Sequence, residues 1–122
     1  MRAAVLAVVL ALVAAGSVHA TLIRSGLYGD VRRGPISPVC AVEQPCDEPA
    51  SGAVLVFSRS GHEVARAKAR ADGTYRVRLM PGYYSVRRAG ASGIDRRLEP
   101  NRVHVRAARF FRVDFSIDTG IR

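Results

Sequence analysis

The sequence contains no tryptophan and only two cysteines, Cys40 and Cys46, among its 122 residues. A structural zinc site takes four ligands, so two cysteines without a nearby histidine do not make one. The motifs G-x-S-x-G, H-E-x-x-H, G-x-G-x-x-G and the P-loop are missing, as is any recognisable arrangement of serine, histidine and aspartate. The sequence therefore predicts a protein without catalytic activity, a metal or a cofactor.

The remaining polar candidates for chemistry are isolated. His62 and His104 stand apart from each other and from the cysteines, and we expect both to be exposed. Asp114 and Asp118 share one face of a predicted strand, where two carboxylates could serve glycoside hydrolysis. Arg112 lies on that face as well, so ion pairing is the simpler explanation of these carboxylates.

Residues 1–20 have the pattern of a signal peptide. Arg2 is a short positive region, residues 3–15 are an unbroken apolar run, and S-V-H-A at the end is a small-residue cleavage site. The alternative is an uncleaved membrane anchor. A spanning helix needs about 20 apolar residues, however, and this run is shorter. We therefore expect export and cleavage after Ala20.

Export sets expectations for the rest of the chain. Residues 21–122 have about the length of one domain. An even pair of nearby cysteines in an exported protein predicts a disulfide, here between Cys40 and Cys46. It would pin residues 33–52, which are rich in proline and read as a long ordered loop. We expect the mature chain to be secreted, periplasmic or at the cell envelope, without spanning a membrane.

Acidic residues are scarce. Ten Asp and Glu stand against nineteen Lys and Arg, which gives a formal net charge of +9, and Lys68 is the only lysine. Such a surface attracts polyanions, which for an exported protein means envelope polymers, anionic lipid head groups or acidic polysaccharides rather than nucleic acid. Alternatively, the arginines reflect GC-rich coding and merely solvate the strand faces.

Hydrophobic residues after the signal alternate with a period of two, which is typical of half-buried strands. The clearest run is residues 109–118, in which Phe111, Val113, Phe115 and Ile117 face inward. Seven short strands separated by turns predict an all-β, antiparallel, Ig-like or transthyretin-like sandwich with Greek-key topology and no helix. We expect the strands at residues 26–32, 53–58, 63–69, 103–105 and 109–118, with two more on either side of Pro81-Gly82.

Residues 63–69 also fit a helix, because alanine, arginine and lysine favour helices. Turn signals on both sides of the segment favour a strand instead. In that strand Ala65, Ala67 and Ala69 would share a face of small side chains.

Residues 71–88 read ADGTYRVRLMPGYYSVRR and contain two turn dipeptides, Asp-Gly and Pro-Gly. Glycine accepts positive φ and proline presets φ, so both dipeptides reverse the chain. The second tyrosine after Pro-Gly would enter the core with its hydroxyl at the edge, where it needs a backbone partner. The residues of this fold motif are Asp72, Gly73, Tyr75, Pro81, Gly82 and Tyr84.

The pattern D-G-x-[FY]-x-[VIF]-x-[LV]-x-P-G-x-Y-x-[VL] is matched by residues 72–86. In this pattern the chain resembles the carboxypeptidase regulatory-like domains, a transthyretin-like and starch-binding-domain-like group, over residues 26–117. The resemblance implies a seven-stranded Ig-like sandwich and a non-catalytic scaffold or binding module, here as a single domain. The resemblance gives almost no information about the ligand.

Two sets of outward residues are candidate binding sites, and the partner of either remains open between an envelope polyanion, a polysaccharide and another protein. Guanidinium groups suit phosphate and carboxylate, and exposed rings suit sugars. We hypothesise an exported, non-catalytic binding or scaffolding module that acts through the arginines, with a carbohydrate-binding module as the alternative. The candidate anion-binding residues are Arg76, Arg78, Arg87 and Arg112, with Arg66 and Arg106 as possible neighbours. The candidate carbohydrate-stacking residues are Tyr28, Tyr83 and Phe110.

Overall fold

The computed structural model describes residues 24–90 and 97–121, so the expected signal peptide lies outside the described residues. The described part contains no helix that could cross a membrane. Its secondary structure is entirely strand and turn. The strands are β1 (Gly26–Gly34), β2 (Glu48–Pro49), β3 (Val54–Arg59), β4 (His62–Lys68), β5 (Thr74–Arg78), β6 (Gly82–Arg88), β7 (Leu98–Glu99), β8 (Arg102–Val105), β9 (Phe110–Arg112) and β10 (Phe115–Asp118).

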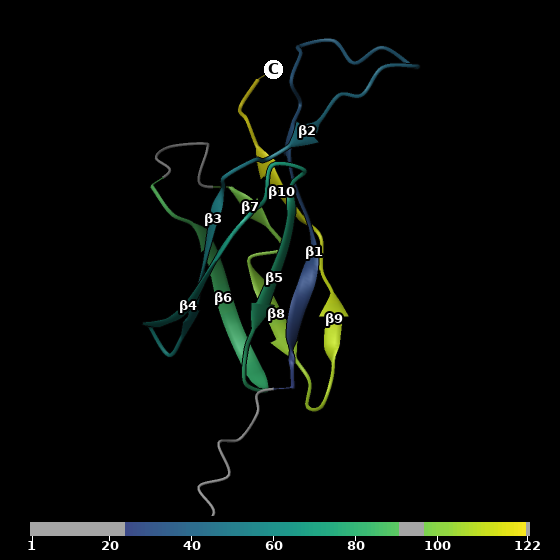
Figure 1. The fold of residues 1–122 in the computed structure, drawn as a ribbon. Coiled ribbons are helices and arrows are strands. Elements are labelled where there is room, and N and C mark those ends of the chain that lie inside the picture. The colour runs from purple at the N-terminus through teal and green to yellow at the C-terminus, as the bar shows by residue number, and fades with distance from the viewer. Residues whose placement is uncertain (1–23, 91–96, 122) are drawn as a thin grey trace, which may run out of the picture.

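The strands form two sheets that face each other as a sandwich (Figure 1). One sheet has the order β4-β3-β6-β8 and is antiparallel throughout. The other has the order β2-β1-β10-β7, with β5 and β9 also paired to β1. The expected β-sandwich is thus confirmed, but the described residues hold ten strands rather than seven.

The long strand β1 organises the second sheet by changing partners halfway along. Its first half lies between β5 and β9, and its second half lies between β2 and β10. The change occurs at Gly29, whose φ is +154° and where an added Cβ would lie 2.4 Å from the Val113 carbonyl oxygen. Only a glycine permits so close an approach of two backbones at this point of the strand.

Residues 109–118 were expected to form one strand, and that prediction is wrong. The segment divides into β9 and β10, because between them the Asp114 carboxylate accepts the Asp30 N–H at 2.9 Å in place of a backbone acceptor. Both pieces run parallel to β1, so the sandwich is not wholly antiparallel. Short-range alternation reveals neither the side chain that interrupts a ladder nor the direction of a distant partner strand.

Two further strands, β2 and β7, lie outside the expected strands, and β2 lies in the segment expected to be a long loop. β2 pairs with the end of β1, and Arg32 there bonds the Asp47 carboxylate at 2.8 and 3.0 Å. β7 pairs with β10. Each has only two residues, too few for a periodic signal. The long loop between β1 and β2 is closed by the expected disulfide between Cys40 and Cys46.

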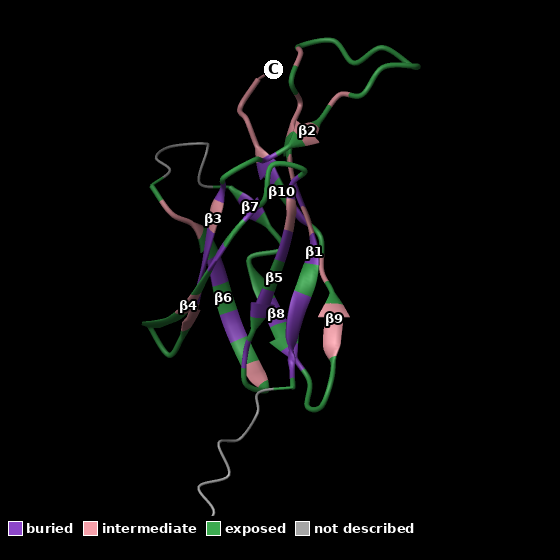
Figure 2. Ribbon diagram, viewed as in Figure 1, coloured by how far each residue is buried: buried purple, intermediate pink, exposed green. Residues whose placement is uncertain are grey.

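The core lies between the sheets and follows the alternation of the strands (Figure 2). The ring of Phe115 packs against Phe57 of the facing sheet and Tyr75 of its own, at centroid distances of 6.3 and 5.4 Å. Phe115 and Ile117 are buried as expected, whereas Phe111 and Val113 are only partly buried. The difference arises because β9 lies at an edge, where the facing sheet covers it less.

The strand prediction for residues 63–69 is confirmed, since β4 covers most of them and Ala67 and Ala69 are buried. Two residues of the fold motif have the conformation or the contact expected of them, whereas Gly82 is the first residue of β6, with a φ of +151°. Gly73 has a φ of +86°, and the Tyr84 hydroxyl donates to the Met80 carbonyl at 2.5 Å. These residues serve the fold.

Candidate functional site

The outer face of β5, β1 and β9 brings together most of the candidate residues. Successive side chains of a strand point to opposite faces of the sheet, so every second residue of β5, β1 and β9 points outward. Arg76 and Arg112 lie in register with Tyr28, one on each side, while Arg78 and Phe110 lie in register with Gly26. We call this surface the arginine–aromatic face; it consists of Tyr28, Arg76, Arg78, Phe110 and Arg112.

Arg76 is held in place by an aromatic ring rather than by a carboxylate. Its guanidinium carbon lies 3.8 Å from the centroid of the Phe110 ring, a cation–π contact. The Phe110 ring in turn lies over Gly26, where an added Cβ would be 2.6 Å from Cε2. Within the described residues, neither Arg76 nor Arg78 forms an ion pair. Arg76 is therefore both ordered and electrically uncompensated.

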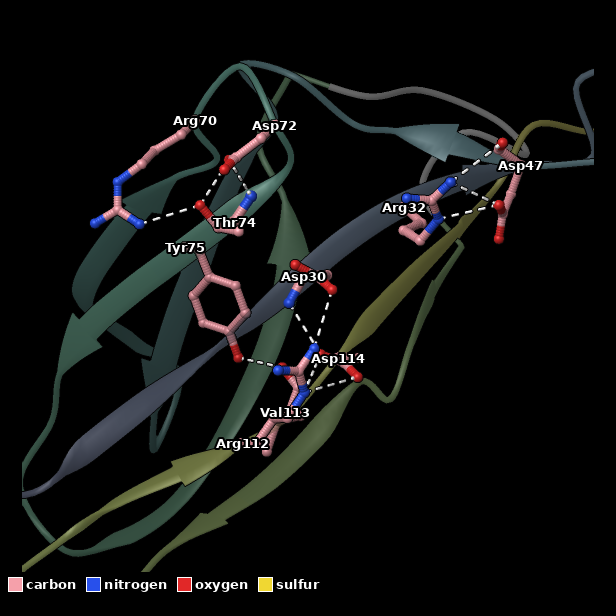
Figure 3. A network of polar contacts seen from close by, with 10 residues as sticks. All are labelled: Asp30, Arg32, Asp47, Arg70, Asp72, Thr74, Tyr75, Arg112, Val113 and Asp114. Carbon is pink, nitrogen blue, oxygen red and sulfur yellow. Dashed lines mark hydrogen bonds and ion pairs between the residues drawn. The ribbon is translucent and has the colours of Figure 1, made fainter. Parts of the chain in front are cut away.

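Arg112, by contrast, is compensated by two carboxylates (Figure 3). Its Nη2 lies 3.0 Å from Asp30 Oδ2, and its Nε lies 3.2 Å from Asp114 Oδ1. The hydrogen bond to Asp114, with the charge of that carboxylate, raises the pKa of Arg112 above its ordinary value. Arg112 thus orders the break between β9 and β10 and adds little net positive charge to the face.

The same network reaches the core through Tyr75. Its hydroxyl donates to the Val113 carbonyl at 2.5 Å (Figure 3). Burial, followed by the nearby charge of Asp114, raises the pKa of Tyr75 well above its ordinary value of 10. The phenol therefore stays protonated and keeps this hydrogen bond across the ordinary pH range.

A shallow cleft of about 260 Å³ opens on this side of the molecule. Arg70, which was not among the candidates, lines it and donates to the Thr74 hydroxyl at 3.1 Å. Its lining combines positive, negative and aromatic side chains: Tyr28, Asp30, Arg70, Thr74, Arg76 and Arg112.

Arg87 does not belong to this surface, so the four candidate arginines do not form one basic face. It extends from β6 on the outside of the other sheet, where its Nη2 lies 3.9 Å from Glu63 Oε1. Arg66 bonds the same carboxylate at 2.8 and 2.9 Å, and this hydrogen bond lowers the pKa of Glu63. Val56, in register with both arginines, is fully buried on this outer side. We call this surface the four-stranded face.

The three candidate aromatic residues do not form one platform either. Tyr28 and Phe110 lie on the arginine–aromatic face, but the Phe110 ring is covered by Arg76 and lies over Gly26. Tyr83 lies on the four-stranded face, stacked on His104 with ring centroids 4.1 Å apart and planes 8° apart. Its exposed fraction is 73%, so much of this ring is open to solvent.

Sequence reasoning missed Arg109, and it did not place Arg106 beside Phe111. Arg109 and Arg106 lie 4.1 and 5.8 Å from the centroid of that ring. Phe111 was assigned to the core, and it is only half-buried. Two consecutive phenylalanines project to opposite faces of a strand, and arginines at both ends of the R-F-F-R run were the available signal.

In the part of the chain that the structure describes, no group of three or more histidine, cysteine or acidic side chains is placed to hold a metal ion. His62 and His104 are both exposed, on different strands.

Comparisons with known proteins support the fold. No protein-family model matches the chain, and no curated protein matches it. The TIE protein of Bacillus anthracis has a similar structure, with a TM-score of 0.51 and 16% identity over 77% of this chain. This chain spans 16% of that protein's length. At such low identity, the likeness shows a shared β-sandwich fold alone.

Two more solved structures resemble the chain at lower similarity. The minor pilin GBS52 of Streptococcus agalactiae aligns with a TM-score of 0.49 and 11% identity, over 77% of this chain and 44% of its own. A DUF3823 family protein from Bacteroides ovatus aligns with a TM-score of 0.47 and 16% identity, over 77% of this chain and 45% of its own.

Proposed function

We propose that this chain is an exported, non-catalytic β-sandwich module that binds anionic polymers at the cell envelope or outside the cell. One observation carries the proposal: among the described residues, Arg76 and Arg78 project side by side from β5 without a carboxylate partner, and Arg76 is ordered on Phe110. Export rests on the signal-like pattern of residues 1–20, and the domain extends over residues 21–122. The motif shared with carboxypeptidase regulatory-like domains supports a binding or scaffolding role.

The spacing of the two arginines suits a repeating anion. Residues i and i+2 of a strand are about 6.6 Å apart on one face, so Arg76 and Arg78 present two guanidinium forks in a row. A guanidinium binds carboxylate or phosphate through paired hydrogen bonds. Because stacking already limits the rotamers of Arg76, less side-chain entropy is lost when it binds.

Paired variants test this proposal. Arg76→Gln with Arg78→Gln should weaken binding to an acidic polysaccharide by at least about tenfold, since the loss of a single hydrogen bond to a charged group, worth roughly 1.5–3 kcal/mol, has that effect. The matched control is Arg87→Gln with Arg102→Gln, which removes the same charge from outward positions on the four-stranded face. Titrations at about 0.1 M and about 1 M salt should show binding only at the lower concentration. Equal losses in both double variants would contradict the proposal, because net charge alone would then explain binding.

A carbohydrate-binding module is the second candidate, and Tyr83 is the observation that favours it. Its ring is largely exposed and is held flat by His104. Binding of a neutral glycan at about 1 M salt that is lost on Tyr83→Ala, and kept in the Arg76 and Arg78 double variant, would place this candidate first.

A further inference from the structure

β9 presents an open strand edge. Among the described residues it pairs with β1 alone, and Figure 1 shows it at the margin of the molecule. The Arg109 carbonyl accepts the Gly26 N–H, and the Val113 N–H donates to the Tyr28 carbonyl, at 3.3 and 2.8 Å. The backbone groups of residues 109, 111 and 113 therefore point toward β1.

Backbone groups of successive strand residues point in opposite directions within the sheet plane. The N–H and C=O groups of Phe110 and Arg112 consequently face the open side of β9. An unpaired row of this kind is a template for an additional strand.

Arginines flank this edge on both faces of the sheet. Arg76 lies against Phe110 on the outer side, at 3.8 Å from the ring centroid. Arg109 and Arg106 lie against Phe111, the neighbouring ring that packs toward the core, at 4.1 and 5.8 Å. Within the described part of the chain, none of the three arginines forms an ion pair.

We propose that the open edge of β9 binds an extended acidic segment of a partner protein by strand addition. The partner's main chain pairs with Phe110 and Arg112, and its acidic side chains point alternately to Arg76 on one face and to Arg106 and Arg109 on the other. This goes beyond the proposed function, because the ligand is a polypeptide and the recognition uses a row of N–H and C=O groups in the register of a β-strand, which a polysaccharide does not have.

The charges around β9 also select the partner. Three uncompensated arginines disfavour addition of another cationic strand, such as β9 of a second copy, and favour an acidic one. Asp114 lies just beyond β9 and carries negative charge. The acidic side chains of the partner should therefore lie toward the start of β9, near Arg109, and away from its end.

A hexaglutamate peptide with blocked ends is a suitable probe, because it has acidic side chains on both faces when extended. The control is the same peptide with an N-methyl group on every backbone nitrogen, which keeps the charge and removes the N–H donors from both edges of the strand. We expect the unmodified peptide to shift the amide resonances of Phe110 and Arg112 and to slow their hydrogen exchange, and the N-methylated peptide to bind about tenfold more weakly. Equal binding of the two peptides, absence of binding, or shifts confined to another edge would each overturn the proposal.

Variants separate this inference from the proposed function. Arg106→Gln with Arg109→Gln should weaken the peptide about tenfold and change polysaccharide binding less than about twofold. Arg76→Gln with Arg78→Gln should weaken both ligands, since Arg76 serves both surfaces. Peptide binding that is unaffected by the first pair overturns the β9 proposal and leaves the polysaccharide result standing. The N-methylation experiment measures peptide binding alone and does not depend on whether the polysaccharide binds. Either proposal can therefore fail while the other stands.

Discussion

Both outer faces of the sandwich carry arginines, but Arg66 and Arg87 on one face and Arg76 on the other have different partners. On the four-stranded face, Arg66 and Arg87 share the carboxylate of Glu63 and cover Val56, which is completely buried. On the arginine–aromatic face, Arg76 lies on the ring of Phe110 and pairs with no carboxylate in the part of the chain that the structure describes. Arginines on one face thus have their charge neutralised within the fold, whereas Arg76 on the other face remains available to bind an anion.

The difference teaches that the partner of an arginine, and not its outward position, decides its role. The aliphatic stems of arginines cover apolar surface while their guanidinium groups reach water or an acid. With a nearby carboxylate, the group is neutralised and adds little to anion binding. Over an aromatic ring it keeps its full charge in a restricted orientation. This contrast makes the arginine–aromatic face the better candidate for binding.

The substitution with the largest expected effect should destabilise both sheets, and with them both outer faces. Phe115→Ala should lower the free energy of unfolding by about 3–5 kcal/mol, because the buried ring joins Phe57 of one sheet to Tyr75 of the other. Chemical denaturation followed by circular dichroism measures this loss. An unchanged midpoint would mean that the faces of β10 have been assigned wrongly.

A smaller effect should be confined to the arginine–aromatic face. Tyr75→Phe leaves the Val113 carbonyl without its donor and should cost about 1–2 kcal/mol. Hydrogen exchange should speed up in β9 more than in the four-stranded sheet. Uniform acceleration in both sheets would show that the hydroxyl does not act on this face alone.

The same substitution has a pH signature. The pKa of Tyr75 is raised in the folded state, so its contribution is complete below the unfolded value of about 10 and is lost as pH rises through the folded value. The stability difference between the original protein and Tyr75→Phe should therefore shrink between about pH 8 and about pH 11. The other tyrosines are present in both proteins and cancel in the difference, so a constant or growing gap would contradict the assignment.

The substitution with the smallest expected effect should free positive charge on the four-stranded face and so make it more similar to the arginine–aromatic face. Glu63→Gln leaves Arg66 and Arg87 without their shared carboxylate and should raise affinity for an acidic polysaccharide about threefold. Glu99→Gln is the matched control, because Glu99 is also exposed and its replacement changes the net charge equally. A binding titration at low salt compares them. Equal gains would show that total charge, rather than local pairing, separates the two faces.

Much of the inner surface was predictable from alternation. Tyr75, Val77, Tyr84 and Val86 are buried as their period-two spacing indicated. The break before Phe115 was not predictable, because it depends on a carboxylate that reaches the backbone of β1, 84 residues away in sequence.

The candidate site was predictable only in part, for a related reason. Alternation placed Arg76 and Arg87 outward, and both are exposed. It could not tell that they lie on different sheets, since β5 and β6 are consecutive strands that pair with different partners. The contacts of Arg106 and Arg109 with Phe111 were missed because that ring lies at a sheet edge, which no local pattern reveals.

The local sequence sufficed for the strand-rich character of the described chain, the inward and outward sides of most strands, the disulfide, the turn at Gly73 and the bend at Pro81. These features depend on neighbouring residues and on the fixed geometry of the backbone. The tertiary structure decided which arginines meet a carboxylate, which lie on a ring and which strand edge stays open. Those outcomes depend on pairings between distant strands, and a change of partner strand gives an arginine different neighbours without altering its local sequence.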